Sequence, residues 1–171
     1  MTEQQQKEIF ENWLCSNKAL VFKIVRAYAF TIPDREDLFQ EIIIQIWNSV
    51  PAFRHKSSVT TWLYRIALNV ALKWNGREIK HHRVTQNTIE NSSPVLQETQ
   101  TPKDERLEWP YEEISRMDEV DRSITLLLLE GFSYREMASI TGITESTIGV
   151  RINRIKKHLI NRSKKYYHYG F

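Results

Sequence analysis

The sequence has little of what small secreted, sheet-rich or membrane-spanning proteins depend on. Its single cysteine, Cys15, allows no internal disulfide, which fits a reducing compartment. Only five glycines and five prolines interrupt 171 residues, and no long alternating run of β-branched residues occurs, so helices are favoured over strands. The longest aliphatic run, 126–129, is far too short to cross a bilayer. No basic and apolar leader opens the chain, so we expect a cytoplasmic protein without membrane insertion.

Charge is unevenly distributed along the chain. Residues 50–83 hold seven Lys or Arg and one Asp or Glu, and residues 131–171 hold eight and two, so each block carries +6. Between them, residues 84–130 hold four basic and eleven acidic residues, a charge of −7. Two basic blocks separated by an acidic one indicate two surfaces that bind polyanions.

Periodicity predicts an all-α protein of two small helical domains joined by a flexible polar linker. In the first domain, 1–83, we expect helices over about 5–30, 34–49 and 60–75, with Asp34 capping the second and Gly76 near the end of the third. Residues 84–108 form the linker, since apolar periodicity vanishes there. The second domain, 109–165, should contain helices over about 109–117, 118–130, 133–140 and 144–164, before a short tail, 166–171.

The helix of residues 34–49 has two patterned faces. At ~100° per residue, Phe39, Ile42, Ile43, Ile46 and Val50 share one face, which we expect to be core. The opposite face mixes apolar anchors with a polar, negative rim, as protein-docking patches do. It consists of Asp37, Gln40, Glu41, Ile44, Trp47 and Asn48. Periodicity alone leaves a second interpretation open, in which Ile44 and Trp47 pack under the N-terminal helix.

A basic and aromatic surface is predicted for the next segment. The loop contains Phe53, Arg54, His55, Lys56, Ser57 and Ser58, and the following helix aligns Trp62, Arg65, Asn69 and Lys73 within a narrow arc. Such a surface can bind single-stranded nucleic acid, because bases stack on the aromatic rings and the neighbouring cations bind the phosphates. The small polar loop could also accept one base turned out of the stack. Alternatively, Trp62 is an ordinary core residue.

The C-terminal half contains a helix-turn-helix pattern. Ser133 and Glu136 have the spacing of a capping box, Gly142 suits a turn with positive φ, and Ala138 falls where two helices would cross. Thr144 is the expected cap of the second helix. Its buried stripe should be Ile148, Ile152, Ile155 and Leu159, and the opposite, basic face suits the major groove of DNA. That face consists of Ser146, Thr147, Val150, Asn153, Arg154 and Lys157, with Arg151 beside it.

Two separate motifs carry a resemblance to a known family. The first motif is Asp34-x-Glu36-Asp37-Leu38-x-Gln40-Glu41 with Trp47. The second consists of Phe53 and Thr61-Trp62-Leu63-Tyr64-Arg65-Ile66-Ala67-x-Asn69. The polar linker and the helix-turn-helix follow in that order. This order resembles a bacterial extracytoplasmic-function (ECF, group four) RNA polymerase sigma factor over almost the whole chain outside the linker and tail. The resemblance implies sigma domain two at the N-terminus and sigma domain four at the C-terminus.

The resemblance also implies roles for the surfaces. The β′ clamp helices of core polymerase would be bound by Asp37, Leu38, Gln40, Glu41, Ile44, Trp47 and Asn48. The β flap of the polymerase would be bound by the second domain. The minus-ten element would be melted and read by residues 53–58 with Trp62, Arg65, Asn69 and Lys73. The minus-thirty-five element would be read as duplex by Arg135, Thr144, Ser146, Thr147, Val150, Arg151, Asn153, Arg154 and Lys157. An anti-sigma factor is a further candidate partner.

Two departures from the family pattern bear on the promoter sequence. Family members commonly carry a basic residue and a serine where this chain has Gly149 and Val150, and the segment 73–77 is less arginine-rich than usual. Glycine inside a helix costs ~1 kcal/mol against alanine, so close approach to the DNA backbone is one reason for Gly149. We hypothesise that an exposed Val150 contacts a thymine methyl group.

Other function classes receive less support. A stand-alone transcriptional regulator with the same helix-turn-helix is the main alternative, but a sensor domain does not need a basic aromatic strip beside an acidic docking helix. We expect no enzyme, no metal and no cofactor, because the sequence lacks a carboxylate cluster with metal spacing, a phosphate-binding glycine loop and a nucleophile–base pair. Asp37 and Glu41 could lie side by side as metal ligands, although such a pair more often forms a solvated or docking face.

Overall fold

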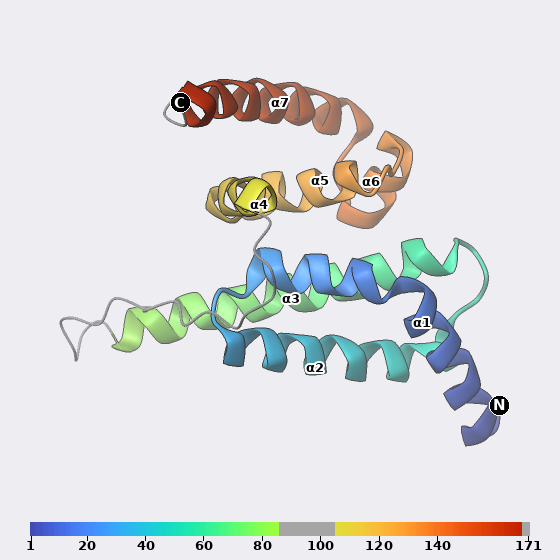
Figure 1. Cartoon of the computed structure of the whole chain (residues 1–171). Coiled ribbons are helices and arrows are strands. Elements are labelled where there is room, and N and C mark those ends of the chain that lie inside the picture. The colour runs from blue at the N-terminus through green and yellow to red at the C-terminus, as the bar shows by residue number, and fades with distance from the viewer. Residues whose placement is uncertain (86–104, 169–171) are drawn as a thin grey trace. The chain divides into compact units, whose positions relative to one another are not determined.

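The structure, a computed structural model, describes residues 1–85 and 105–168, with side chains for 1–77 and 109–164. Within these ranges it contains seven α-helices, one 3-10 turn and no strand (Figure 1), which confirms the predicted all-α fold class. The chain divides into two compact units, Met1–Glu108 and Trp109–Phe171. Most of the predicted linker, 86–104, lies outside the described residues, as do residues 169–171 of the predicted tail.

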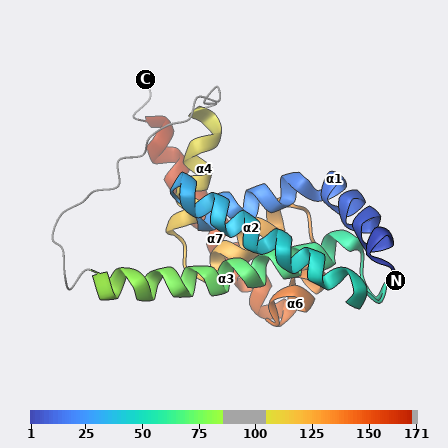
Figure 2. The same cartoon turned by 90° about the horizontal axis from the view of Figure 1, so that it is seen from below.

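Unit 1 is a three-helix bundle. Helix α1 spans Glu3–Tyr28, α2 spans Ile32–Ser49, the 3-10 turn η1 spans Val50–Ala52, and α3 spans Val59–Thr85. All three helices pack against one another, and both views show them side by side (Figures 1 and 2). The fully buried side chains between them include Ile24, Tyr28, Ile42, Ile46, Leu63 and Tyr64. These stripes recur every three to four residues, as the core face of a helix does.

The predicted helix boundaries in unit 1 need two corrections. Thr31, not Asp34, caps α2: its hydroxyl accepts a hydrogen bond from the Asp34 amide at 3.2 Å, and Pro33 occupies the first turn, where a missing N–H costs nothing. Helix α3 does not end near Gly76 but continues to Thr85. Ser58 caps it, because its hydroxyl accepts a hydrogen bond from the Thr61 amide at 3.1 Å.

Unit 2 contains the predicted helix-turn-helix. Helix α4 spans Glu105–Arg116 and belongs to unit 2 from Trp109 onward; α5 spans Glu119–Leu129, α6 spans Tyr134–Thr141, and α7 spans Glu145–His168. The α6–α7 pair is joined through Gly142, which has the predicted positive φ, 75°. The capping box is confirmed: the Glu136 amide donates to Ser133 Oγ, and the Ser133 amide donates to Glu136 Oε2.

The core of unit 2 is aliphatic. Ile148, Ile152 and Ile155 of α7 are buried as predicted, against Ile124 and Leu127 of α5 and Met137 of α6, whereas Leu159 is half-buried. Burying one such side chain contributes about 1.5–3 kcal/mol. The opposite face of α7 is therefore fixed outward, because the helix cannot rotate without exposing this stripe.

Candidate docking and nucleic-acid surfaces

The exposed face of α2 carries an isoleucine among polar side chains. Ile44 is 56% exposed, and Asp37, Gln40 and Asn48 of the same helix are exposed around it. Trp47 behaves differently, because it is half-buried and its ring meets Phe10 of α1 edge-on at 5.3 Å. Of the two interpretations left open by the sequence, packing under α1 thus holds for Trp47 and not for Ile44.

Leu38 does not belong to that exposed face. Its side chain has no exposed surface and lies in the core of unit 1 with Ile42 and Ile46, one and two turns further along α2. Of the predicted core stripe, Ile42, Ile46 and Val50 are buried as expected, whereas Phe39 and Ile43 are half-buried. The helix is therefore rotated slightly from the predicted phase, and a partner that binds this face cannot touch Leu38 in this structure.

Glu41, also on this face, has a partner that sequence spacing could not reveal. Both of its carboxylate oxygens accept hydrogen bonds from Nη2 of Arg77 on α3, at 2.8 and 2.6 Å. The Glu41 side chain keeps 41% of its surface exposed.

Gln6 of α1 makes another long-range hydrogen bond to α2, because its Nε2 donates to the Trp47 carbonyl at 2.9 Å.

The loop of residues 53–58 is built around one aromatic ring. Phe53 contacts three others, with ring centroids 5.0 Å from Trp13, 4.6 Å from His55 and 5.7 Å from Trp62. His55 has φ 55°, a left-handed backbone conformation that non-glycine residues seldom adopt. The hydrophilic loop side chains Arg54, His55, Lys56, Ser57 and Ser58 are all exposed.

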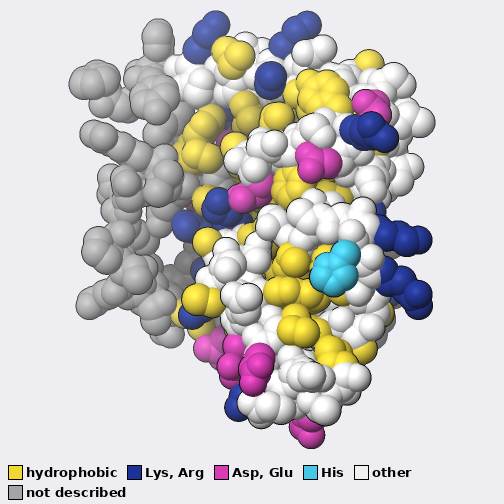
Figure 3. Space-filling model, turned by 90° about the vertical axis from the view of Figure 1, so that its right-hand side faces the viewer, with side chains coloured by type: hydrophobic (Ala, Val, Ile, Leu, Met, Phe, Trp, Pro, Cys, Tyr) yellow, Lys and Arg dark blue, Asp and Glu magenta, His cyan; other side chains and the backbone are white. Residues whose placement is uncertain are grey.

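Trp62 lies between the two interpretations given for it. It is half-buried against Phe53, and its Nε1–H donates to Ser49 Oγ at 3.3 Å, so part of the ring is packed and part faces solvent. Along α3, Arg65 is half-buried, and Asn69 and Lys73 are exposed. Loop and helix together present rings beside cations. On the face drawn in Figure 3, hydrophobic side chains reach the surface among polar ones, and Lys and Arg lie mostly toward the edges.

The outward face of α7 is polar, with one apolar residue. The exposed side chains are Thr144 at the cap, Ser146, Thr147, Val150, Asn153, Arg154 and Lys157, and Arg135 is exposed on α6. Val150 is 70% exposed. A Cβ at Gly149 would lie 3.5 Å from the Tyr134 ring, an ordinary contact, so nothing within unit 2 forbids a side chain there. The Thr147 amide donates to Thr144 Oγ1, which matches the predicted cap.

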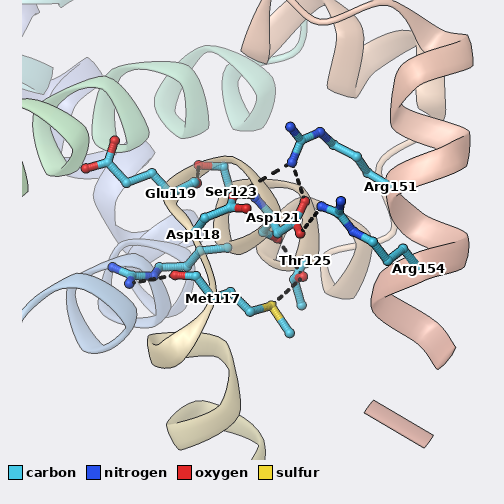
Figure 4. A network of polar contacts seen from close by, with 9 residues as sticks. Met117, Asp118, Glu119, Asp121, Ser123, Thr125, Arg151 and Arg154 are labelled. Atoms are coloured by element: carbon cyan, nitrogen blue, oxygen red, sulfur yellow. Dashed lines mark hydrogen bonds and ion pairs between the residues drawn. The ribbon is translucent and has the colours of Figure 1, made fainter. Parts of the chain in front are cut away.

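Two arginines of this surface meet one carboxylate. Arg151 Nη1 lies 2.6 Å from Asp121 Oδ1, and Arg154 Nη2 lies 2.5 Å from Asp121 Oδ2 (Figure 4). Asp121 stands in the first turn of α5 and its side chain is 12% exposed. No local pattern in the sequence marks Asp121, because about thirty residues separate it from both partners.

A second carboxylate binds the C-terminal half of α7. Glu113 of α4 is buried, and it accepts hydrogen bonds from Nε and Nη2 of Arg162, the closest at 2.7 Å, and from Arg116 at 3.2 Å. His158 Nε2 lies 3.6 Å away. The hydrogen bonds from Arg162 hold the pKa of Glu113 below its ordinary value, although burial opposes them.

Metal and membrane sites receive no support from the residues described. Within 1–85 and 105–168, no group of three His, Cys, Asp or Glu side chains could hold a metal ion. None of the helices over those ranges combines the length and apolarity needed to cross a bilayer.

Comparison with known families gives two matches, one in each unit. Residues 15–78 match Sigma-70 region 2, and residues 111–159 match Sigma-70, region 4. The ECF RNA polymerase sigma-E factors of Haemophilus influenzae and of Escherichia coli K12 are both 31% identical to this chain over 140 residues. These alignments cover 75% of this chain, with 74% of the Haemophilus protein and 73% of the Escherichia coli protein.

Two solved structures have the same fold. The sigma factor RpoE, in complex with the anti-sigma factor NepR from Bartonella quintana, aligns with a TM-score of 0.70 at 23% identity, over 92% of this chain and 98% of that one. CnrH, in complex with the cytosolic domain of CnrY, aligns with a TM-score of 0.64 at 16% identity, over 93% of this chain and 90% of that one.

Proposed function

Because the chain belongs to the ECF sigma factors of RNA polymerase, we propose that it binds core polymerase, melts the minus-ten promoter element and reads the minus-thirty-five element. We further assign it to group four of that family, to which the motifs of residues 34–69 point, and to the cytoplasm. It is not an enzyme in this proposal, and its surfaces contribute only binding energy.

The docking surface for the β′ clamp helices is the exposed face of α2. It comprises Asp37, Gln40, Glu41, Ile44 and Asn48, with the partly packed Trp47 at its edge. The observation that carries the assignment is Ile44, an apolar side chain 56% exposed within a polar and acidic rim. Such an anchor gains free energy when a partner covers it, while the rim sets the orientation.

The minus-ten surface is the basic loop 53–58 together with Trp62, Arg65, Asn69 and Lys73 of α3. Phe53 and Trp62 provide rings, and the exposed Arg54, Lys56 and Lys73 provide cations next to them in sequence or on the same helix. Stacking contributes ~1–3 kcal/mol per base, which the protein gains only when the bases are unpaired. This difference between single-stranded and duplex DNA is what drives melting.

The minus-thirty-five surface is the outward face of α7. It consists of Arg135, Thr144, Ser146, Thr147, Val150, Arg151, Asn153, Arg154 and Lys157. The buried isoleucines of α7 keep this face outward, as a helix in the major groove requires. Unit 2 also contacts the β flap in this proposal. Held on one polymerase, the two units raise each other's effective concentration at DNA, so neither needs high affinity alone.

An anti-sigma factor is the further partner we propose. The observation in its favour is the fold shared with the sigma factor RpoE, which was solved in complex with the anti-sigma factor NepR. Exposed apolar side chains, including Phe22 (48%) and Leu129 (63%), provide surface for it. Isolation from cells of a bound protein that blocks holoenzyme assembly would identify it.

Reconstituted transcription tests the proposal. Purified chain is mixed with core polymerase lacking other sigma factors, and start sites are mapped across genomic DNA. We expect a polymerase complex on gel filtration and initiation at a defined set of sites. A chain that binds duplex DNA tightly by itself, and neither elutes with polymerase nor supports initiation, is a stand-alone regulator instead.

A further inference from the structure

The two arginines on the flank of the α7 surface share a single counter-ion. Arg151 uses Nη1 for one oxygen of Asp121, and Arg154 uses Nη2 for the other, so both carboxylate oxygens are occupied (Figure 4). Asp118 lies further off, with Oδ1 3.8 Å from Arg151 Nη1. The three closest groups together carry +1 instead of the +2 that two isolated arginines would present to DNA.

Asp121 is held firmly in place. Its amide donates to Asp118 Oδ1 at 2.8 Å, and its carbonyl accepts from Thr125 Oγ1 at 2.7 Å. The residue lies in the first turn of α5, where the helix end favours a negative charge. Its side chain is 12% exposed, whereas that of Arg154 is 62% exposed. A fixed, shielded anion thus faces a cation that still reaches solvent.

A carboxylate and a phosphate offer a guanidinium similar pairs of oxygens. Any DNA phosphate that approaches Arg151 or Arg154 must therefore compete with Asp121 for the same N–H groups. This competition reduces binding to the backbone of every sequence alike, because phosphates carry no sequence information. It leaves the base contacts of Val150 and Asn153, at the centre of the face, unaffected.

We propose that Asp121 is a specificity-determining residue: it withholds Arg151 and Arg154 from DNA phosphates and so suppresses binding to DNA of arbitrary sequence. This inference rests on the proposed function of the α7 face as a duplex-binding surface. It assigns to α5 a part in promoter choice, although α5 does not itself enter the groove.

The test is Asp121→Asn in the full chain, with a random-sequence 30-base-pair duplex as the probe and salt as the variable. Freeing two arginines adds up to two phosphate contacts, so the slope of log affinity against log salt steepens by about 1–2, and binding at low salt tightens by about tenfold. The matched control is Asp118→Asn. It removes the same charge from a side chain 60% exposed and, as an asparagine, still caps α5. We expect less than about a twofold change in that control.

The Arg151→Gln/Arg154→Gln background separates the two proposals. If the two arginine changes weaken duplex binding, the assigned DNA surface is supported. Adding Asp121→Asn to the arginine changes should then have no further effect on duplex binding. If the wild-type chain binds duplex through these arginines but Asp121→Asn leaves binding unchanged or weaker, the carboxylate does not withhold them and the inference is wrong. If no variant binds duplex, or if the arginine changes do not weaken binding even in the Asp121→Asn protein, both the inference and the assigned DNA surface are wrong.

A measurement on the unchanged protein covers the case in which Asp121→Asn does not fold. NMR of the arginine side chains in the wild-type full chain should show hindered guanidinium rotation for Arg151 and Arg154 without DNA. Saturating random duplex at low salt should release Asp121 and shift both signals. Guanidinium groups that rotate freely without DNA would contradict the proposal, because Asp121 would then not hold them.

Discussion

Arg77 of α3 donates to both carboxylate oxygens of Glu41 on α2, at 2.8 and 2.6 Å. The pair is partly exposed, with 58% of the Arg77 and 41% of the Glu41 side chain accessible, so it adds at most about 1 kcal/mol to stability. The main effect of this ion pair is to hold the Glu41 carboxylate in position. It fixes one acidic group on the face that we propose for polymerase docking, while Ile44 on the same face remains open to a partner.

Glu41→Lys is expected to leave unit 1 folded and to reduce polymerase binding by at least about tenfold, since it reverses a charge on the docking rim and brings a cation against Arg77. Circular dichroism and thermal unfolding check the fold, and gel filtration or fluorescence anisotropy with core polymerase checks the binding.

The double variant Glu41→Lys/Arg77→Glu is the control for that experiment. It restores an ion pair between α2 and α3 with the charges exchanged, so the local repulsion is removed while the docking face keeps the wrong sign. Binding that stays lost in the double variant identifies a direct contact. Recovery of binding would mean that Glu41 acts only through Arg77, and the docking assignment of Glu41 would be withdrawn.

Trp62→Ala is expected to weaken promoter opening more than closed-complex formation, because the lost stacking platform serves only unpaired bases. A loss of about 2 kcal/mol corresponds to about thirtyfold in the opening equilibrium. Permanganate reactivity of the minus-ten thymines reports opening, and footprinting of the duplex upstream reports the closed complex.

Ser49→Ala is the matched control for Trp62. It removes the acceptor of the indole N–H, 3.3 Å away, and leaves both the Trp62 ring and the contact with Phe53 in place. Near wild-type opening in Ser49→Ala would assign the effect to the ring. Equal losses of opening and of closed-complex binding in Trp62→Ala would contradict the role given to Trp62.

Val150 should contact a thymine methyl group in the minus-thirty-five element. The side chain is 70% exposed, so Val150→Ala should not affect folding. With a mapped promoter, thymines are replaced by uracil one position at a time. Wild-type holoenzyme should lose about fourfold in affinity at one position, as for the burial of one methyl group, and the Val150→Ala holoenzyme should lose nothing further there. A panel without any sensitive position refutes the contact.

The sequence predicted those features whose causes are local. The capping box of Ser133 and Glu136, the turn at Gly142 and the buried isoleucines of α7 all depend on residues within one or two helical turns of each other. Gly76 misled the prediction of where α3 ends, because the ~1 kcal/mol cost of glycine in a helix is too small to end a helix by itself.

The features that sequence reasoning missed depend on distant partners. Arg77 lies 36 residues from Glu41, and Asp121 lies 30 residues from Arg151, so no spacing rule connects them. Leu38 entered the predicted docking surface through the family resemblance, whereas its side chain is buried with Ile42 and Ile46. Periodicity placed Phe39 and Ile43 in the core, but they are half-buried. A helix buried on more than one side shows too broad an apolar stripe for periodicity to fix its rotation, and the packing of α1 and α3 decides it.

Glu113 makes the stability of unit 2 depend on pH. Arg162 lowers the pKa of Glu113 in the folded state through their hydrogen bonds, so the stabilisation is present above the unfolded-state pKa, ~4.3. It is lost as the pH falls through the folded pKa, because the carboxylate is then protonated in both states. Unfolding of unit 2, followed by the methyl signals of Ile148 and Ile152 at several pH values, should show this loss.

Glu113→Gln should therefore destabilise unit 2 near neutral pH and flatten the acid part of its stability profile. The side chain is 3% exposed and is bonded to Arg162 and Arg116, so we expect a loss of about 2 kcal/mol at pH 7. Glu112→Gln makes the same chemical change at an exposed neighbouring position and should change little. Because unit 1 does not contain this cluster, its unfolding should be the same in both variants. If Glu112→Gln and Glu113→Gln shift the unit 2 midpoint equally, the loss reflects net charge and not the buried cluster that connects α4 to α7.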